Sequence, residues 1–363
     1  MTEPVFSGKL PENSNLEQLR KQARELQRSG GHANLASAQH ALAQHYGFPS
    51  WPKMKLAVEM AMLRRFIAEG NAEAVQGLLQ SAPKLATMSF PEGDTPLHHA
   101  SEINRPDIVE VLVRAGAPFT TPYAHSSHTA LSWAITVWSM DAARKLVELG
   151  CVPDLFCAAG LGMMPQVQSF WKSGVLLPKP SRTGSSRYSE SGERLPCPPP
   201  EDIDQISDAL YIACRANQPE AARWLLDHGA DPNWRGFCGA TCLAWAEVSG
   251  NPELAALLRE RGGSDDLRDA EFLATPRVFA LMVLTAWGFS SRLRARLESD
   301  PLQVNARGGW GTLLNAAAFN GQIETAKVLL EFGADRNAVN AAGLTASQMA
   351  ASRGHKELSA LLA

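Results

Sequence analysis

Residues 95–117 read TPLHHASEINRPDIVEVLVRAGA, and this stretch decides the fold because variants of it recur along the chain. The phrase returns as TALSWAITVWSMDAARKLVELGC at 129–151, DALYIACRANQPEAARWLLDHGADPN at 208–233, TCLAWAEVSGNPELAALLRERGG at 241–263 and TLLNAAAFNGQIETAKVLLEFGADRN at 312–337. Such self-similarity indicates stacked repeats in which each unit contacts its neighbours. The length of 363 residues also exceeds the ~250–300 at which single cores stop growing.

Two short helices are predicted in each repeat. Thr95 provides a hydroxyl that can cap the first helix, and Pro96 stands at the first helical position, where its missing N–H costs nothing. Apolar residues then recur at three- and four-residue spacing up to position 113, which gives each helix one buried stripe. A left-handed glycine is expected to end each second helix. These glycines are Gly116, Gly150, Gly229, Gly262 and Gly333.

The turn residue between the two helices of each repeat is used as the reference position, called the anchor, for aligning the repeats. Three degenerate stretches, 62–85, 155–174 and 281–300, and a terminal repeat that ends in HKELSALLA at 355–363 keep the helix-pair pattern and raise the expected number of pairs to nine. Five of the eight steps between successive anchors are 33 or 34 residues long. The anchors are Gly70, Asn104, Trp138, Gly162, Asn217, Gly250, Gly288, Gly321 and Gly354.

The TPLHHA motif at Thr95 and the endings HGADPN at 228–233 and FGADRN at 332–337 resemble the ankyrin repeat. The resemblance covers roughly residues 60–363 apart from one insertion, and it implies an all-α ankyrin-repeat solenoid with hairpin-like turns. The N-terminal pattern is similar to the extension of bacterial ankyrin-repeat proteins. We therefore expect four regions along the chain. These are an N-terminal helical cap (1–58), four repeats (59–175), a Ser/Pro/Arg-rich flexible loop (176–202) and five repeats (203–363).

Two of these regions have more than one possible role. Residues 15–58 predict three helices, the third beginning after Ser50 and continuing into the first repeat. They are interpreted as a cover for the exposed apolar end of the solenoid, with an independent partner site as the alternative. The 176–202 segment is too polar for a core, and a lid or partner-binding role is its alternative to a simple flexible connection.

Composition and charge narrow the class of protein. A net charge of −3 and a pI near 6.3 provide no global field for nucleic acid. The first residues lack a signal-peptide pattern, and the longest apolar stretch, 278–289, is too short to span a membrane. Six irregularly spaced cysteines are interpreted as reduced, mostly buried thiols. We expect a monomeric cytoplasmic protein without a cofactor.

No catalytic signature accompanies the repeats: the sequence has no nucleophile elbow, zinc-binding HExxH or phosphate-binding glycine loop in a suitable context. One cluster has metal-ligand chemistry, because imidazole and carboxylate suit zinc. The resemblance implies a structural role for His98, in the turn, so metal binding or catalysis stays the alternative. The cluster comprises Asp94, His98, His99, His125 and His128.

The resemblance implies a binding surface made of the projecting turns and the exposed end of each first helix, along a concave groove. Aromatic residues and arginine dominate interface energetics, which favours the C-terminal half as its centre. Packing against neighbouring repeats is the alternative for these aromatics. The predicted partner-binding residues are Glu102, Ile103, Tyr123, His125, His128, Arg215, Trp234, Phe237, Trp287, Trp310, Phe319 and Asn320.

The sequence thus predicts a non-catalytic scaffold that binds a protein partner, with an enzyme or metal-binding protein as the alternative. That alternative would use the histidine cluster (His98, His99 and His128) or the 176–202 loop. If the surface assignment is right, replacing Trp234 and Trp310 with alanine abolishes partner capture and leaves the melting temperature nearly unchanged.

Overall fold

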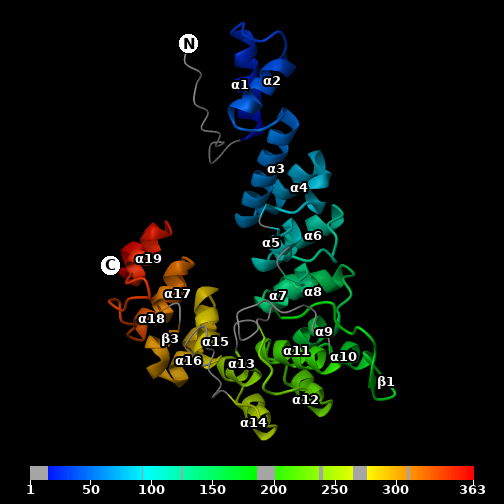
Figure 1. Cartoon of the computed structure of the whole chain (residues 1–363), viewed down its shortest axis with the longest axis vertical. Coiled ribbons are helices and arrows are strands. Elements are labelled where there is room, and N and C mark those ends of the chain that lie inside the picture. The colour runs from blue at the N-terminus through cyan, green and yellow to red at the C-terminus, as the bar shows by residue number, and fades with distance from the viewer. Residues whose placement is uncertain are drawn as a thin grey trace. The chain divides into compact units, whose positions relative to one another are not determined.

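The computed structural model describes residues 15–91, 93–123, 126–185, 201–236, 240–264, 276–308 and 311–363. These residues form mainly α-helices, coloured along the chain in Figure 1, with only short strands between them. The chain divides into two compact units. Unit 1 comprises residues up to 124 together with 141–150, and unit 2 comprises residues 125–140 and 151–363.

Unit 1 is entirely helical over its described residues. Within it, α3 packs on α5 and α4 packs on α6, so that the two helices of one repeat contact their counterparts in the next. Its elements are α1 (Leu16–Arg28), α2 (Leu35–His45), α3 (Trp51–Ala68), α4 (Ala72–Ser81), η1 (Pro83–Thr87), α5 (Pro96–Glu102), α6 (Pro106–Arg114) and all but the first residue of α8 (Met140–Glu148).

Unit 2 begins with α7 (Ala130–Thr136) and continues to the last described helix. Two antiparallel hairpins project from it: β1 (Trp171–Lys172) pairs with β2 (Val175–Leu176), and β3 (Arg307–Gly308) pairs with β4 (Gly311–Thr312). Its other elements are α9 (Leu155–Leu161), α10 (Met164–Ser169), α11 (Asp202–Arg215), α12 (Pro219–Asp227), α13 (Cys242–Val248), α14 (Pro252–Glu260), α15 (Pro276–Ala286), α16 (Ser290–Ser299), η3 (Pro301–Asn305), α17 (Leu313–Phe319), α18 (Ile323–Glu331), α19 (Ala346–Ser352) and α20 (Lys356–Leu362).

The nine predicted helix pairs are confirmed, from α3 and α4 to α19 and α20. All nine anchor residues, from Gly70 to Gly354, have a positive φ, which lets the chain reverse between the two helices. Trp138 is the exception in residue type: its φ of 59° is rare for a bulky side chain, while Asn104 and Asn217 tolerate this region more easily. The five glycines expected after the second helices also have a positive φ.

The predicted capping threonines begin their helices. Thr95 accepts a hydrogen bond from the His98 N–H at 3.2 Å, and the His98 ring accepts one from the Thr95 N–H, so that the two residues cap each other. Equivalent reciprocal caps begin α7 at Thr129 and α17 at Thr312. The turn histidine at position 98 therefore satisfies backbone groups, as the resemblance implied.

First helices form a continuous layer in unit 2. The helices α7, α9, α11, α13, α15, α17 and α19 pack on one another in this order, and the green-to-red part of Figure 1 shows this succession. The second helices α10, α12 and α14 pack in the same order, as do α16 and α18. Leucine and alanine fill the space between the layers, including the fully buried Leu225, Leu258 and Leu329. Small residues let the first helices approach closely.

The N-terminal segment has its own apolar cluster, made by α1, α2 and the first half of α3. Helix α3 begins after Ser50, whose side chain accepts from the Lys53 N–H, and runs without a break into the first repeat. Both features match the prediction. Leu19, Leu42, Met54 and Val58 pack at the centre of the cluster. Because one helix belongs to both the segment and the first repeat, the segment is a direct continuation of the stack.

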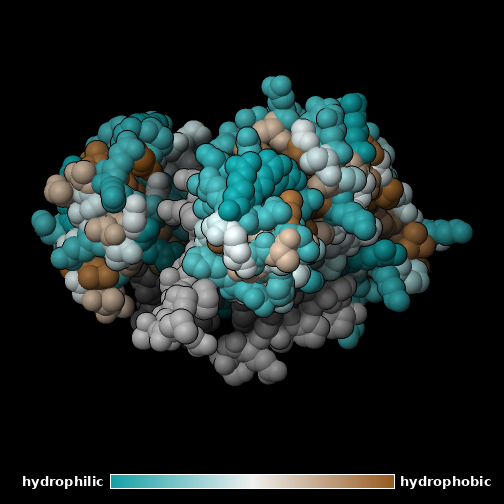
Figure 2. Space-filling view, turned by 90° about the horizontal axis from the view of Figure 1, so that it is seen from above, coloured by the Kyte–Doolittle hydropathy of each residue, from teal (hydrophilic) through white to brown (hydrophobic). Residues whose placement is uncertain are grey.

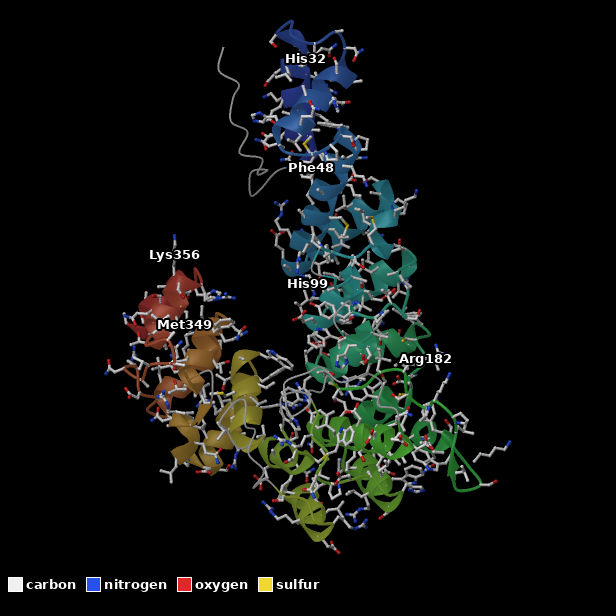
Figure 3. The ribbon with its side chains drawn as sticks, viewed as in Figure 1. His32, Phe48, His99, Arg182, Met349 and Lys356 are labelled. Carbon is white, nitrogen blue, oxygen red and sulfur yellow. The ribbon has the colours of Figure 1, made fainter. Side chains whose placement is uncertain are left out.

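The prediction of a flexible loop over 176–202 is wrong for residues 176–185. The Asp154 carboxylate, which caps α9, also accepts hydrogen bonds from the Arg182 and Thr183 N–H groups at 3.0 Å and from the Thr183 hydroxyl at 2.5 Å. Ser181, Thr183 and Ser185 are buried as a result. Arg182 itself points outward, as Figure 3 shows. Residues 186–200 lie outside the described part of the chain.

Helix α11 has 14 residues, which is twice the seven residues of a first helix such as α17. It begins six residues before Asp208, the position where a threonine caps α17 in the later repeat. The Asp208 carboxylate instead accepts from the Ser185 N–H at 2.6 Å and from Trp234 Nε1 at 3.1 Å. The fifth repeat thus replaces the usual cap with contacts to its two flanking loops.

Candidate functional site

The predicted binding surface is defined by the last residue and the C-cap of each first helix, here called the helix-end surface. In the eighth repeat, Phe319 is 43% exposed and Asn320 is also exposed. The guanidinium of Arg353, from the end of α19, lies 4.2 Å from the centroid of the Phe319 ring. An exposed aromatic ring with an arginine stacked on it is therefore available at this end of unit 2.

In unit 1, the same positions of the second repeat are also exposed. Glu102 ends α5, and Ile103 follows it as the C-cap with 36% of its surface exposed. Tyr123 is half-buried, and its ring lies 6.1 Å from that of His98. The large exposed hydrophobic residues of the described chain are otherwise scattered, and hydrophobic residues form only small patches on the face shown in Figure 2.

Two predicted partner-binding residues are not on the surface. His128 is 3% exposed, because its ring is covered by Trp133 at 5.6 Å and Phe156 at 6.0 Å. Arg215 is 0% exposed, although it ends α11 just as Phe319 ends α17. Neither side chain therefore lies on the exposed helix-end surface, where both were expected.

Trp234 and Trp287 are half-buried rather than exposed. Trp234 is tied to the buried Asp208 carboxylate by its Nε1 donor, so it contributes to the packing of the fifth repeat. This contact argues against the prediction that Trp234→Ala leaves the melting temperature unchanged. Trp287 lies 6.1 Å from the Trp133 ring. His125, Phe237 and Trp310 lie outside the described residues.

Arg215 lies in a cluster that the sequence did not predict, here called the Arg–Trp cluster: Trp138, Arg215, Trp245, Trp287 and Arg292. The Arg215 guanidinium carbon lies 4.4 Å from the Trp245 ring centroid, 4.9 Å from that of Trp287 and 5.4 Å from that of Trp138. Arg292 lies over Trp138 at 4.1 Å. The cluster joins the third, fifth, sixth and seventh repeats within unit 2.

The Arg–Trp cluster has more hydrogen-bond donors than acceptors and more positive than negative charge. Trp138 donates its indole N–H to the Arg215 carbonyl at 2.7 Å, and Arg215 Nη1 donates to the Tyr211 hydroxyl at 3.4 Å. Four buried donors have no acceptor in the described part of the chain: Arg215 Nε and Nη2, Trp245 Nε1 and Arg292 Nη1. Burial lowers the pKa of Arg292, and the nearby Arg215 charge lowers it further. The cluster therefore combines two cations with several unused donors.

Comparison with known families matches most of these repeats. A family model described as ankyrin repeats (3 copies) matches residues 63–156 and 193–269, and one described as ankyrin repeats (many copies) matches residues 297–363. Together the matches cover more than half of the chain. The chain belongs to the ankyrin-repeat family. Ankyrin repeats are generally protein–protein interaction modules, and proteins built from them are typically non-enzymatic scaffolds.

The predicted histidine cluster of this ankyrin protein is divided between the two units, and its described histidines take part in separate local contacts. His98 is used by the Thr95 cap in unit 1, and His128 lies 3.3 Å from the Ser132 hydroxyl in unit 2. His99, labelled in Figure 3, has a buried Nε2 without a partner. Burial and Arg64 lower its pKa, against an opposing effect of Asp94. Among the residues that the structure describes, no group of three or more His, Cys, Asp or Glu residues could hold a metal ion.

Sequence reasoning missed the tryptophans and Arg292 around Arg215, although one signal pointed to them. Trp138 occupies an ankyrin turn position filled by glycine or asparagine in every other repeat, and its backbone is left-handed. A bulky residue there is retained only if its side chain contributes packing that offsets the strain. Separately, none of the helices in the described parts of the chain has the length and apolar character needed to cross a membrane.

Proposed function

We propose that this ankyrin-repeat protein is a non-catalytic scaffold that binds a protein partner through its helix-end surface, centred on Phe319 and Arg353. The observation that carries the proposal is the exposed Phe319 ring with the Arg353 guanidinium stacked 4.2 Å from its centroid. Aromatic residues and arginine are the types that contribute most to binding energy at interfaces.

The geometry of this pair favours binding over packing. Arg353 is exposed, and the Phe319 carbonyl lies 3.3 Å from His355 Nε2 of the last repeat. The ring therefore has a fixed position before a partner arrives, which reduces the entropy lost on binding. A partner would remove both the exposed part of the ring and the face of the guanidinium from water, and the surrounding polar Asn320 would form the rim.

A wider contact would extend along the helix-end positions of unit 2. A standard interface buries ~800 Å² on each partner, more than one aromatic residue can supply. Within unit 1, Glu102, Ile103 and Tyr123 are candidate contacts of a separate surface because they stand at equivalent helix-end or turn positions. The identity of the partner depends on these side chains and not on the ankyrin fold, since one scaffold hosts many specificities.

We also propose that the protein acts as a monomer in the cytoplasm. The observation that supports this compartment is a set of buried free thiols, Cys151, Cys157, Cys214 and Cys242. Burial raises the pKa of Cys151 to about 11, with Asp154 adding to the effect, which keeps the thiol protonated and unreactive. Reduced buried thiols are typical of a reducing compartment.

The test is affinity capture from the native host with three forms of the full chain. Wild-type protein is expected to retain a protein that Phe319→Ala loses by at least about tenfold, since an exposed hot-spot aromatic contributes ~2 kcal/mol or more to binding. Leu302→Ala is the matched control. Leu302 is 92% exposed on η3, outside the helix-end surface, so its replacement should leave capture unchanged.

The comparison of the two variants decides the proposal. Loss of capture by Phe319→Ala together with retention by Leu302→Ala supports the helix-end surface. Equal capture by Phe319→Ala and wild type contradicts it, and so does equal loss in both variants. Circular dichroism of each variant checks that the helices are retained.

A further inference from the structure

Among the residues that the structure describes, the guanidinium of Arg215 stands out because it is completely buried and has no anionic partner there. Buried charges in proteins are normally paired with an opposite charge or hydrogen-bonded at every donor. Within the described residues, no carboxylate forms an ion pair with Arg215 or Arg292. The fold therefore retains a cation in its interior without its usual counterpart.

The aromatic rings account for only part of the stabilisation that this cation needs. Trp245, Trp287 and Trp138 surround the guanidinium, and cation–π attraction stabilises its charge through the ring faces. The rings accept no N–H donor at the guanidinium edge. Only Nη1 has a hydrogen-bond acceptor, the Tyr211 hydroxyl, while Nε and Nη2 have none. A complete edge of the guanidinium thus remains without an acceptor.

The two nitrogens without an acceptor, Nε and Nη2, form the edge of a guanidinium that binds a carboxylate through two parallel hydrogen bonds. The same chain shows this geometry at Arg105, where Nε donates to Asp107 Oδ1 at 2.9 Å and Nη2 donates to Asp107 Oδ2 at 2.6 Å. Two parallel hydrogen bonds of this kind match the spacing of carboxylate oxygens. Arg215 presents the same edge, without an Asp or Glu on it.

Two further donors in the Arg–Trp cluster also have no acceptor. The indole N–H of Trp245 and Nη1 of Arg292 are both buried. Arg215 and Arg292 lie 5.4 and 4.1 Å from the same Trp138 ring centroid, so two positive charges are close together. An anion bound beside them would satisfy donors and reduce the repulsion between the cations. A second cation or a neutral donor would do neither.

We propose that the Arg–Trp cluster is a binding site for a carboxylate, which the Nε–Nη2 edge of Arg215 holds and Arg292 helps to neutralise. This inference rests on the proposed function only for the source of the carboxylate, an Asp or Glu side chain of the protein partner. Because Nε and Nη2 of Arg215 are buried, the carboxylate reaches them when Trp287 and Arg292, the partly exposed members of the cluster, move aside. The tryptophan rings then cover its aliphatic stem.

Isothermal titration with two short synthetic peptides tests the proposal on the full-length protein, without any partner. One peptide carries a single glutamate between glycines with both ends blocked, and the matched peptide carries glutamine. The glutamate peptide is expected to bind about tenfold more tightly, because only a carboxylate provides two charged acceptors for the Arg215 edge. Inorganic phosphate at matched ionic strength is titrated in parallel.

Two variants separate a binding role of the arginine from a structural one. Arg215→Leu removes the charge and keeps an apolar side chain, and such replacements of buried charges often leave stability equal or higher. We expect its melting temperature to equal or exceed that of the wild type, and the preference for glutamate to disappear. Arg292→Gln, at the partly exposed edge, is expected to fold normally and to reduce the preference several-fold.

Three results would overturn the carboxylate site. The first is equal affinity for the glutamate and glutamine peptides, or no binding of either. The second is a preference for glutamate that persists in both Arg215→Leu and Arg292→Gln. The third is binding of phosphate without binding of the glutamate peptide, which would assign the cluster to a different anion. Partner capture does not enter this experiment, so its failure is distinguishable from failure of the proposed function.

Discussion

The fifth and eighth repeats place different residues at the same position, with opposite outcomes. Arg215 ends α11 and is 0% exposed, whereas Phe319 ends α17 and is 43% exposed. The charged Arg215 side chain is therefore buried and the apolar Phe319 side chain reaches solvent, which is the reverse of what residue type alone favours. The position in the repeat does not determine whether a side chain reaches water.

Neighbouring repeats determine the exposure instead. Trp138, from the third repeat, donates to the Arg215 carbonyl and contacts Trp245 and Phe289 at ring-centroid distances of 5.7 and 4.5 Å. These rings cover the end of α11. At the end of α17, the Arg353 guanidinium covers only one face of Phe319. The two repeats thus differ through side chains that belong to other repeats.

The largest expected effect comes from removing the cover over Arg215. Trp138→Asn keeps a residue type that tolerates the left-handed backbone, as Asn104 and Asn217 do, and removes the buried ring. Loss of a buried tryptophan costs ~3–5 kcal/mol, and relief of the left-handed strain offsets ~1 kcal/mol of this. Urea unfolding should therefore show a decrease of about 2–4 kcal/mol in the free energy of unfolding.

Urea unfolding of Phe319→Ala measures the corresponding change at the end of α17 in the eighth repeat. Because Phe319 is 43% exposed and the Arg353 guanidinium covers only one face of its ring, its removal should change the free energy of unfolding by less than about 1 kcal/mol. If Trp138→Asn and Phe319→Ala destabilise the protein equally, the difference between the two helix ends is not one of packing, and the comparison fails.

An intermediate effect is expected at the start of the fifth repeat. Asp208→Ala removes the acceptor for Trp234 Nε1 and the Ser185 N–H, and both donors are held against the protein interior. Hydrogen bonds to a charged group contribute ~1.5–3 kcal/mol each, with some replacement by water at the half-buried tryptophan. The free energy of unfolding should fall by about 2–3 kcal/mol, measured by urea unfolding.

Asp208→Asn is the control for this prediction, because it retains one acceptor oxygen and adds an NH₂ group. Its loss of stability should lie between those of wild type and Asp208→Ala. Equal stability of all three forms would show that the two loops are held by other contacts.

The fold could be predicted from the sequence because its determinants are local. Thr95 and Thr312 begin helices by contacts three residues away, and the left-handed turn at Gly321 needs only its own backbone freedom. These features recur in phase, so each repeat reinforces the interpretation of the next. Ser50 likewise indicated the start of α3 correctly.

The candidate site and the 176–185 segment could not be predicted because their determinants are distant. Arg215 is covered by Trp138, 77 residues away, and nothing in the fifth repeat indicates this contact. Thr183 is ordered by Asp154, 29 residues away, so a polar segment that has no core of its own is still buried. The composition of a segment describes only that segment. It does not show that a distant carboxylate, here Asp154, accepts hydrogen bonds from its N–H groups.

A smaller effect than that of Asp208→Ala is expected at the regular start of the eighth repeat, which tests it against the altered start of the fifth. Thr312→Ala removes the side chain that accepts from the Asn315 N–H and donates to its side chain, which should cost about 1 kcal/mol in the free energy of unfolding. Thr312→Ser keeps the hydroxyl and should cost only a few tenths of that amount. A loss for Thr312→Ala as large as that for Asp208→Ala would mean that the ordinary cap stabilises its repeat as much as the loop contacts stabilise the fifth.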